Sequence, residues 1–275
     1  MDKTEINEKF LEEYGSDDAV RKYTTGTAGF GINYLLHNDY ARIYLDAVDS
    51  FLTNSPQRPL RILEFGCGAG MNVINLVSLL EQKGITVECA YGTDFSERLV
   101  ESATQEAKAA LTPGLAKKLS FHVARNELLV EDLASASGKP ANDFLGFFDL
   151  IIGVNTFRYC HRLGKERDCA NDIYRMLRTG GVCVNIDMND RFPAFRSRLK
   201  STTEDATECY IPSLDEYATP FQAAGFEITS KKNFCWIPHS AGPALTLCCR
   251  LASPVLNLVV PSRAMRSLVV ARKTN

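Results

Sequence analysis

Short apolar runs alternate with helical segments along most of this chain of 275 residues. The expected strands are residues 61–65, 86–93, 119–123, 148–154 and 182–188. Helical patterns separate them at 71–83, 96–110 and 165–177, and the last of these helices is expected to end at Gly180–Gly181. Apolar strands that alternate with helices need cover on both faces of their sheet. The pattern therefore predicts an α/β, doubly wound fold around a mostly parallel sheet.

The two ends of the chain depart from this alternation. Residues 1–58 are expected to form a helical N-terminal cap or lid, with an amphipathic helix at 39–52, and residues 59–275 the main domain. In the tail, 213–224 is expected to be a helix, and 226–236 and 268–273 are expected to be strands. Between these strands lies an insertion, 238–266, whose apolar run 244–260 is broken by Arg250 and Pro254. We expect a pair of short core or cap helices there, or an interfacial membrane contact, because a spanning helix needs about 20 uninterrupted apolar residues.

Composition narrows the class of protein. The chain is 45% hydrophobic with a net charge of −2, so it lacks the global positive field that favours nucleic-acid binding. Its nine cysteines form no C-x-x-C pair, and only four histidines are present, so no metal site is expected. Cysteines within apolar segments, such as Cys183, are typical of a reducing compartment. With a polar N-terminus that lacks an apolar signal segment, this predicts a cytoplasmic protein.

A glycine run, Glu64-Phe65-Gly66-Cys67-Gly68-Ala69-Gly70, joins the first strand to the following helix. Glycines at every second position let a ligand lie against the backbone, and the helix N-terminus presents free N–H groups to it. The dinucleotide pattern G-x-G-x-x-G fails because Met71 stands at its third glycine, and no Lys-Ser or Lys-Thr follows Gly70 to make a phosphate loop. The run indicates a nucleoside-type site or, alternatively, a plain tight turn.

A second piece follows the next strand, where Asp94 and Phe95 lie at its carboxyl end. Ligands of open α/β sheets lie across the carboxyl ends of the strands. There a carboxylate can accept hydrogen bonds from both hydroxyls of a ribose, and Phe95 can pack against an adenine. The alternative role for Asp94 is a helix cap, which the neighbouring Ser96 already supplies.

A third piece is the segment after the fourth expected strand, which carries Asn155, Arg158, Tyr159 and His161. A turn needs fewer hydrogen-bonding and aromatic groups than this, so we expect a loop that forms a pocket wall. The fifth strand ends similarly, with Asp187.

With these pieces in order, the chain resembles the class I S-adenosylmethionine-dependent methyltransferases. The resemblance covers residues 60–184 and 267–273, and it rests on 64–70, on Gly92-Thr93-Asp94-Phe95-Ser96, and on 148–152 with 177–181. It implies a Rossmann-like sheet of seven strands whose last strand runs antiparallel. It also implies S-adenosyl-L-methionine as the cofactor and S-adenosyl-L-homocysteine as the product.

The resemblance also implies roles for single residues. The loop formed by Gly66, Cys67, Gly68 and Gly70 would let the methionine portion pass, and Glu64 would help to fix that end. Asp94 would hold the ribose, Phe95 would pack on the adenine, and Asn155 would border the sulfonium. Many family members carry an acidic residue after the third strand for the adenine amino group; this chain has Asn126 in that region.

These inferences predict methyl transfer to an O or N atom of a small-molecule acceptor, such as a natural product or metabolite. Among the candidate catalytic residues, His161 is the base candidate, because it titrates near neutral pH, and Arg158 can pair with an acidic acceptor. Tyr159 lies between Arg158 and His161 in the sequence and is the third candidate. The expected acceptor-binding residues are Tyr23, Tyr34, His37 and Asp187. The segment 24–31 is either a lid over the site or an ordinary surface loop.

Other functions stay open at this point. An RNA methyltransferase would often carry an Asn/Asp-Pro-Pro-aromatic motif after the fourth strand, where this chain has Asn155-Thr156-Phe157-Arg158. A lipid methyltransferase would use the apolar run 244–260 at a membrane surface. A non-catalytic S-adenosylmethionine-binding partner protein would keep the glycine loop and Asp94. Neither the acceptor nor the oligomeric state follows from the sequence.

Overall fold

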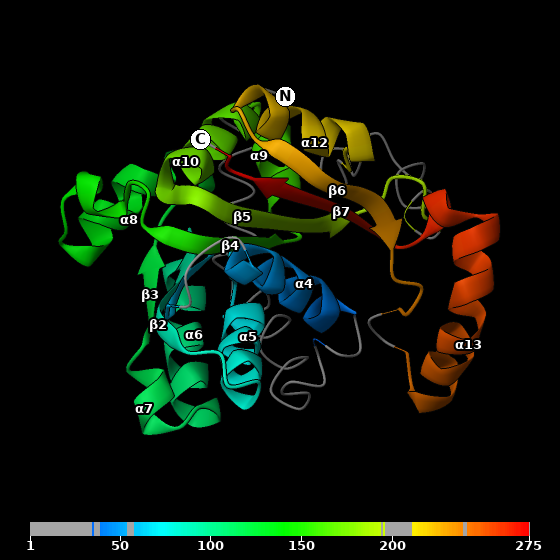
Figure 1. The fold of residues 1–275 in the computed structure, drawn as a ribbon, viewed down its shortest axis with the longest axis horizontal. Coiled ribbons are helices and arrows are strands. Elements are labelled where there is room, and N and C mark those ends of the chain that lie inside the picture. The colour runs from blue at the N-terminus through cyan, green and yellow to red at the C-terminus, as the bar shows by residue number, and fades with distance from the viewer. Residues whose placement is uncertain are drawn as a thin grey trace.

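One seven-stranded sheet forms the centre of the fold. A computed structural model describes residues 35, 39–53, 58–193, 195, 211–238 and 241–274. The strand order is β3-β2-β1-β4-β5-β7-β6, with β7 antiparallel to both neighbours and β1 to β5 parallel (Figure 1). The strands are β1 Leu60–Phe65, β2 Val87–Asp94, β3 Leu119–Val123, β4 Phe148–Val154, β5 Leu177–Met188, β6 Glu227–Phe234 and β7 Arg266–Arg272. This confirms the doubly wound α/β fold and its antiparallel final strand.

Helices cover both faces of the sheet (Figure 1). The α-helices are α4 Tyr40–Thr53, α5 Met71–Gln82, α6 Glu97–Ala110, α7 Pro113–Ala116, α8 Leu129–Ser137, α9 Phe157–Leu163, α10 Glu166–Met176, α12 Leu214–Ala223 and α13 Pro243–Val259. Short 3-10 turns are η1 Asn126–Leu128, η2 Ala141–Phe144 and η4 Pro261–Arg263. Successive strand residues point to opposite faces, so Ile62 packs with α4 and α5 whereas Leu63 packs with α8, α10 and α12.

Local sequence signals explain where several helices begin. Ser96 caps α6, because its hydroxyl accepts a hydrogen bond from the backbone N of Leu99 at 3.5 Å. Ser213 and Glu216 form a reciprocal capping box at the start of α12. These are the sites at which the sequence predicts helix starts.

The N-terminal helix α4 packs onto the sheet. Its buried side chains, which include Tyr40, Tyr44 and Phe51, belong to the same apolar cluster as Ile62 on β1. Most residues of the expected cap, 1–58, lie outside the described part, so a domain boundary at residue 58 stays a prediction.

The predicted end of the helix between the fourth and fifth strands is wrong. Helix α10 ends at Met176 and β5 already begins at Leu177, so Gly180 and Gly181 lie within the strand rather than at a helix end. The reason is pairing with the last strand: Gly180 N donates to Lys273 O at 2.7 Å, and Lys273 N donates to Gly181 O at 3.0 Å.

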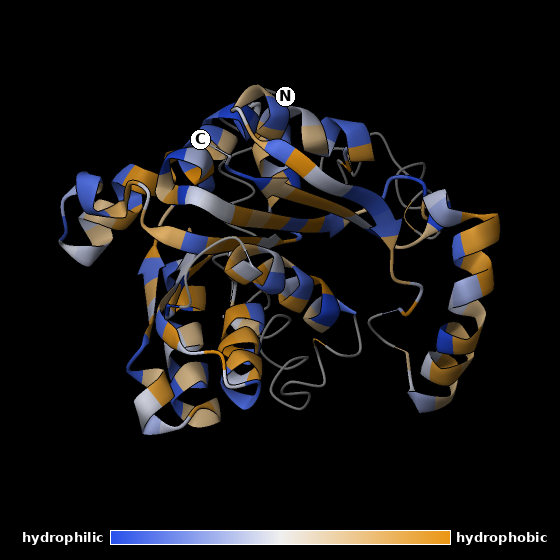
Figure 2. Ribbon diagram, in the orientation of Figure 1, coloured by the Kyte–Doolittle hydropathy of each residue, from blue (hydrophilic) through white to orange (hydrophobic). Residues whose placement is uncertain are grey.

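The insertion also differs from its prediction. One helix of 17 residues, α13, replaces the expected pair of short helices, and none of its residues is buried. It stands at the edge of the molecule, away from the sheet (Figure 1), and Figure 2 shows apolar residues along its length. None of the described helices is both long and apolar enough to cross a membrane.

Candidate active site

The glycine loop between β1 and α5 is open at one position and closely packed at another. Gly66, Gly68 and Gly70 have φ angles of +58°, +54° and +80°, a region that favours glycine. A β-carbon on Gly66 would lie 1.9 Å from Oγ1 of Thr156, whereas one on Gly68 would meet nothing within 4 Å. The backbone at Gly68 is therefore the part of the loop that a ligand can approach closely.

Glu64 anchors this loop from within the core. Its side chain is buried and accepts hydrogen bonds from Val73 N at 2.8 Å and from Asn72 Nδ2 at 3.0 Å, which ties the first turn of α5 to β1. Burial raises the pKa of Glu64 to about 8. This geometry gives Glu64 a role in positioning the loop and offers no support for its expected contact with the methionine portion.

Asp94 lies across the loop at the end of β2. Its side chain accepts hydrogen bonds from Gly68 N at 2.9 Å and from Ser96 N at 3.0 Å, and the residue is 5% exposed. Burial raises its pKa to about 6, so the group is largely ionised at neutral pH. Each carboxylate oxygen can accept a further bond, so the group suits the two hydroxyls of a ribose beside Gly68.

The other cofactor candidates surround the loop in different ways. The Phe95 side chain is half-buried. Cys67 is buried, and its backbone N donates to Thr93 O at 2.7 Å. Asn126 Nδ2 donates to Thr156 Oγ1 at 2.7 Å, which places its amide against the segment after β4. No sequence signal pointed to Phe121, whose ring would clash with a β-carbon at Gly70 or Gly92.

The segment after β4 is a helix rather than the expected loop. Asn155 has a φ of +56°, and α9 begins two residues later at Phe157. Phe157 and Cys160 lie on one helical face and are buried in the core, and Gly164, with a φ of +66°, ends the helix. Four of the predicted site residues therefore lie on or beside a rigid element.

Four polar residues meet at the carboxyl ends of β4 and β5 and the start of β7: Asn155, Arg158, Asp187 and Arg266. We call them the arginine cluster. Arg158 donates from its backbone N to Asp187 Oδ2 at 3.0 Å, and its Nε lies 3.8 Å from Oδ1. Arg266 Nη1 donates to Asn155 Oδ1 at 2.5 Å. Burial raises the pKa of Asp187, and the Arg158 charge opposes this rise. Arg158 thus pairs with the buried Asp187 carboxylate, and Arg266, which is hydrogen-bonded to Asn155, adds a second positive charge nearby.

Tyr159 and His161 lie on different sides of α9. The Arg158 guanidinium stacks on the Tyr159 ring at 4.2 Å from its centroid, and the two side chains are also hydrogen-bonded. The His161 ring packs edge-on against Phe157 at 5.2 Å and Tyr217 at 5.7 Å. Burial lowers the pKa of His161. The predicted base therefore lies against the aromatic core beneath α12, and its catalytic role stays a prediction.

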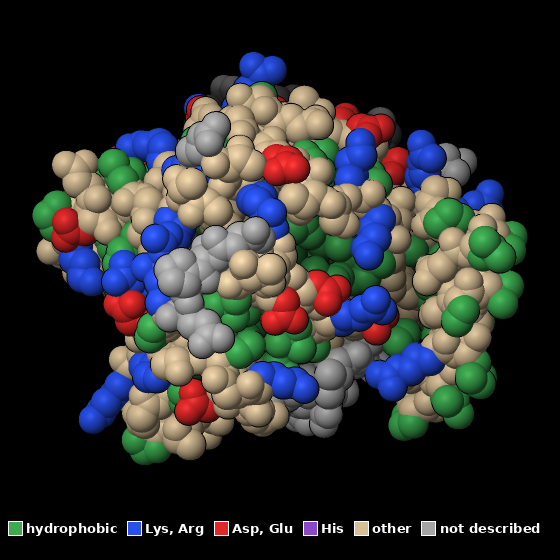
Figure 3. All heavy atoms as spheres, viewed as in Figure 1, with side chains coloured by type: hydrophobic (Ala, Val, Ile, Leu, Met, Phe, Trp, Pro, Cys, Tyr) green, Lys and Arg blue, Asp and Glu red, His purple; other side chains and the backbone are tan. Residues whose placement is uncertain are grey.

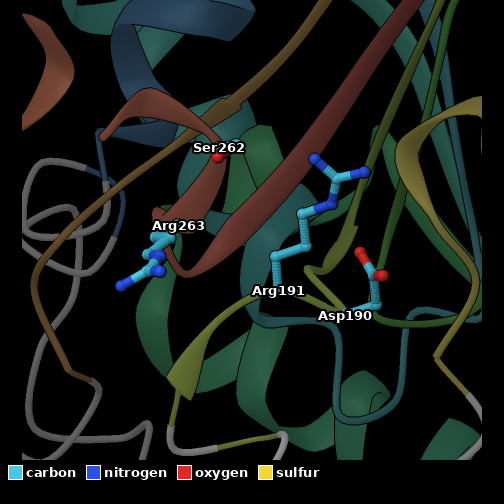
Figure 4. A pocket seen from close by; sticks show the side chains of 4 residues that line it. All are labelled: Asp190, Arg191, Ser262 and Arg263. Carbon is cyan, nitrogen blue, oxygen red and sulfur yellow. The ribbon is translucent and has the colours of Figure 1, made fainter. Parts of the chain in front are cut away.

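A cavity of about 470 Å³ lies beyond the end of β5. The turn after β5 lines it with Asp190 and Arg191, and η4 lines it with Ser262 and Arg263 (Figure 4). Asn189 joins the two segments, because its Nδ2 donates to Ser262 O at 2.8 Å and to Ala264 O at 2.6 Å. The volume falls within the range of small-molecule sites, about 300–1,000 Å³.

Three predicted acceptor residues, Tyr23, Tyr34 and His37, lie outside the described residues, as does the segment 24–31. Arg266, by contrast, was missed by the sequence argument. Its signal was a charge at the start of an apolar strand, a position that buried strands tolerate only when the charge is paired. Among the described side chains, no three His, Cys, Asp or Glu gather in a way that could hold a metal ion.

Glycine loop, β2 carboxylate and seven-stranded sheet together define an S-adenosylmethionine-dependent methyltransferase of class I. A family model described as a methyltransferase domain matches residues 57–240, and the chain belongs to this family. The protein is therefore an enzyme of the transferase class with a Rossmann-like fold.

Comparison with known proteins gives further relatives. The chain is 29% identical over 158 residues to the non-reducing polyketide synthase tazA of Aspergillus terreus, a match that covers 55% of this chain and 5% of the synthase. The chain thus spans only a small part of the curated relatives that it matches. The solved structure of the citrinin polyketide synthase CMeT domain is similar with a TM-score of 0.53 and 18% identity, over 80% of this chain and 48% of that one. The [4+2]-cyclase SpnF is similar with a TM-score of 0.55 and 16% identity, over 85% and 81%.

Proposed function

We propose that this methyltransferase methylates a small-molecule acceptor of the polyketide type, a phenol or a 1,3-dicarbonyl compound, after the acceptor has lost a proton. The observation that carries the proposal is the arginine cluster, which brings the guanidinium groups of Arg158 and Arg266 to the carboxyl ends of β4 and β5. The relation to polyketide synthases supports the same acceptor class. The acceptor would enter through the cavity between Arg191 and Arg263.

The glycine loop fits the cofactor. Gly68 leaves its backbone open to a ligand, and the Asp94 carboxylate beside it can accept from the ribose hydroxyls. When bound, S-adenosylmethionine supplies an electrophilic methyl group on a sulfonium. We assign Gly68 to the passage of its methionine portion and Phe95 to the adenine, whereas Gly66 and Gly70 pack against Thr156 and Phe121 and so shape the loop.

The chain's own residues then have to bind the acceptor, keep it anionic and align it. A guanidinium close to an acidic oxygen favours its charged form, so Arg158 and Arg266 lower the acceptor's pKa and hold the nucleophile ionised. An ammonium acceptor fits less well, because the same two cations repel it. Of the expected O or N acceptors, an acidic hydroxyl group is the better match. In the enolate of a 1,3-dicarbonyl compound the negative charge is shared between the oxygens and the carbon between the two carbonyls, so this carbon is a possible methylation site as well. Alignment of the nucleophile with the methyl group and the sulfur supplies most of the remaining rate enhancement.

The experiment is methylation with labelled S-adenosylmethionine of three probes: a resorcinol-type phenol, a β-keto thioester and a primary alkyl amine. We expect label on the phenol or the β-keto probe, and mass spectrometry of the product then separates O-methylation from C-methylation. Label on the amine alone would refute the acceptor class. Label on none of the probes, but on RNA or lipid from an extract, would favour one of the other acceptors that the sequence left open.

A pair of variants tests the role of the cluster. Arg158→Lys keeps the backbone bond to Asp187 and a positive charge but loses the planar fork. We expect it to move the acidic limb of the kcat/KM profile upward by about one pH unit while cofactor affinity is unchanged. His161→Asn is the matched variant on the same helix and should leave that limb in place. If the limb moves with His161→Asn and not with Arg158→Lys, the base is His161 and the proposed ionisation by arginine is wrong.

A further inference from the structure

Helix α13 exposes its apolar face and turns smaller or more polar residues toward the molecule. The exposed side chains include Leu251, Leu258 and Val255, at 72%, 84% and 62% exposure. The half-buried positions are Thr246, Cys249, Ser253 and Leu256, which recur every three or four residues and so lie on the opposite face. Among the described residues, Trp236 Nε1 donates to Asn257 Oδ1 at 2.7 Å, and Cys249 packs against the apolar cluster that contains α4 and α5. In Figure 3 the apolar atoms of this helix lie along the outer edge of the molecule.

This exposed apolar face is expected to bind a partner, because an apolar patch of this size is uncommon on the solvent-exposed surface of a monomeric protein. The helical period of 3.6 residues places Ala244, Leu247, Cys248, Leu251, Pro254, Val255 and Leu258 on one outward stripe. The stripe carries no charged residue. Arg250, the one charged residue of α13, lies about a quarter-turn to its side.

The order of residues along this stripe is symmetrical about Leu251. A two-fold axis through Leu251 would bring Leu247 opposite Val255 of a second antiparallel copy, Ala244 opposite Leu258, and Leu251 opposite itself. The same operation brings Arg250 opposite Ala252, so the two arginines do not face each other. Two-fold interfaces require this kind of self-complementary surface.

We infer that α13 is an isologous dimerisation element that packs antiparallel against α13 of a second copy of this chain. The seven exposed residues of this stripe offer on the order of 600 Å² per protomer, or about 1,200 Å² across the pair, which exceeds the roughly 1,000 Å² expected of a biological interface. A membrane surface is the less suitable occupant, because interfacial helices are usually rich in Lys and Arg on their polar face and α13 carries only Arg250.

The test is light scattering of the native chain over a dilution series. The proposal predicts twice the mass of the 30.5 kDa chain, and a monomer for Leu251→Glu, which sets two carboxylates against each other at the axis. Leu145→Glu is the matched control, since Leu145 is 40% exposed and lies outside α13, between η2 and β4. Circular dichroism shows that each variant is folded. A native monomer at every concentration, or a Leu251→Glu dimer, overturns the proposal.

A cross-link tests the register as well. In a Cys248→Ser background, Leu251→Cys should form an inter-chain disulfide on mild oxidation, because the axis brings the two copies of this position together. Leu245→Cys in the same background is the control, since it lies about 120° around the helix from the axis. Equal cross-linking of both variants would refute the antiparallel register. A monomeric native chain that sediments with phosphatidylcholine–phosphatidylserine vesicles, and fails to do so as Leu251→Glu, would assign α13 to a membrane surface instead.

Discussion

Replacing Asp94 by alanine is expected to weaken binding of S-adenosylmethionine about 100-fold. The Asp94 carboxylate lies 2.9 Å from Gly68 N, where the loop is open, so it is placed to accept from both hydroxyls of a ribose. A hydrogen bond to a charged group contributes about 1.5–3 kcal/mol, so losing two costs about 3 kcal/mol at the lower limit. That free energy corresponds to about two orders of magnitude in Kd.

Titration calorimetry with S-adenosylhomocysteine measures the loss, and its 2′-deoxy analogue identifies the cause. The substitution also removes the bonds from Gly68 N and Ser96 N, which could loosen the loop without any role for the ribose. If Asp94 holds the ribose, the deoxy analogue should bind the native enzyme more weakly, by about tenfold, while Asp94→Ala should bind both compounds alike. An unchanged affinity in Asp94→Ala, or a variant that still distinguishes the two ligands as the native enzyme does, would refute this assignment.

Two further predictions concern the same loop. Burial raises the pKa of Asp94 to about 6, and protonation below that value removes the charge that accepts from the ribose, so cofactor affinity should fall about tenfold per pH unit below pH 6 and stay level above it. A flat Kd from about pH 5 to about pH 8 would contradict this. Gly66→Ala should lower the thermal midpoint markedly, because its β-carbon meets Thr156, whereas Gly68→Ala should cost only about 1–2 kcal/mol of backbone strain yet weaken cofactor binding. Melting curves with and without S-adenosylhomocysteine separate the two effects, and the reverse ranking would show that the loop presents a different glycine to the ligand.

Local sequence patterns predicted most of the sheet. Strands β3 and β4 have the bounds that the sequence pattern predicted. The start of β5 could not be predicted in this way. It depends on pairing between Gly180 and Lys273, which are far apart in the chain, and no local pattern at Gly180–Gly181 distinguishes such a strand from a helix end.

The same distinction between local patterns and long-range contacts applies to the candidate site. Glu64 and Asp94 lie at the carboxyl ends of β1 and β2, and the glycines follow β1, so the strand-to-helix patterns and the parallel pairing of the two strands were enough to predict that they meet. The arginine cluster depends on a tertiary contact, in which Arg266 reaches Asn155 across 111 positions of sequence. Helix α13 shows a further limit of sequence-based prediction. Periodicity predicts a helix with an apolar face, but it carries no information on whether that face is turned inward.

The charged residues of the site indicate whether each side of it, the cofactor side or the proposed acceptor side, acts on ligand binding or on the rate of methyl transfer. Burial raises the pKa of Glu64 to about 8 and that of Asp94 to about 6, so Asp94 is the more readily ionised of the two carboxylates at the glycine loop. Arg158 and Arg266 supply the opposite sign on the side where we propose that the acceptor binds. Transfer of a methyl group from a sulfonium to an anion cancels both reacting charges, so fixed charges stabilise the separated reactants at least as strongly as the transition state. In the proposed reaction the arginines act through acceptor binding and ionisation, so their variants should change KM and the pH profile more than kcat, which depends on alignment.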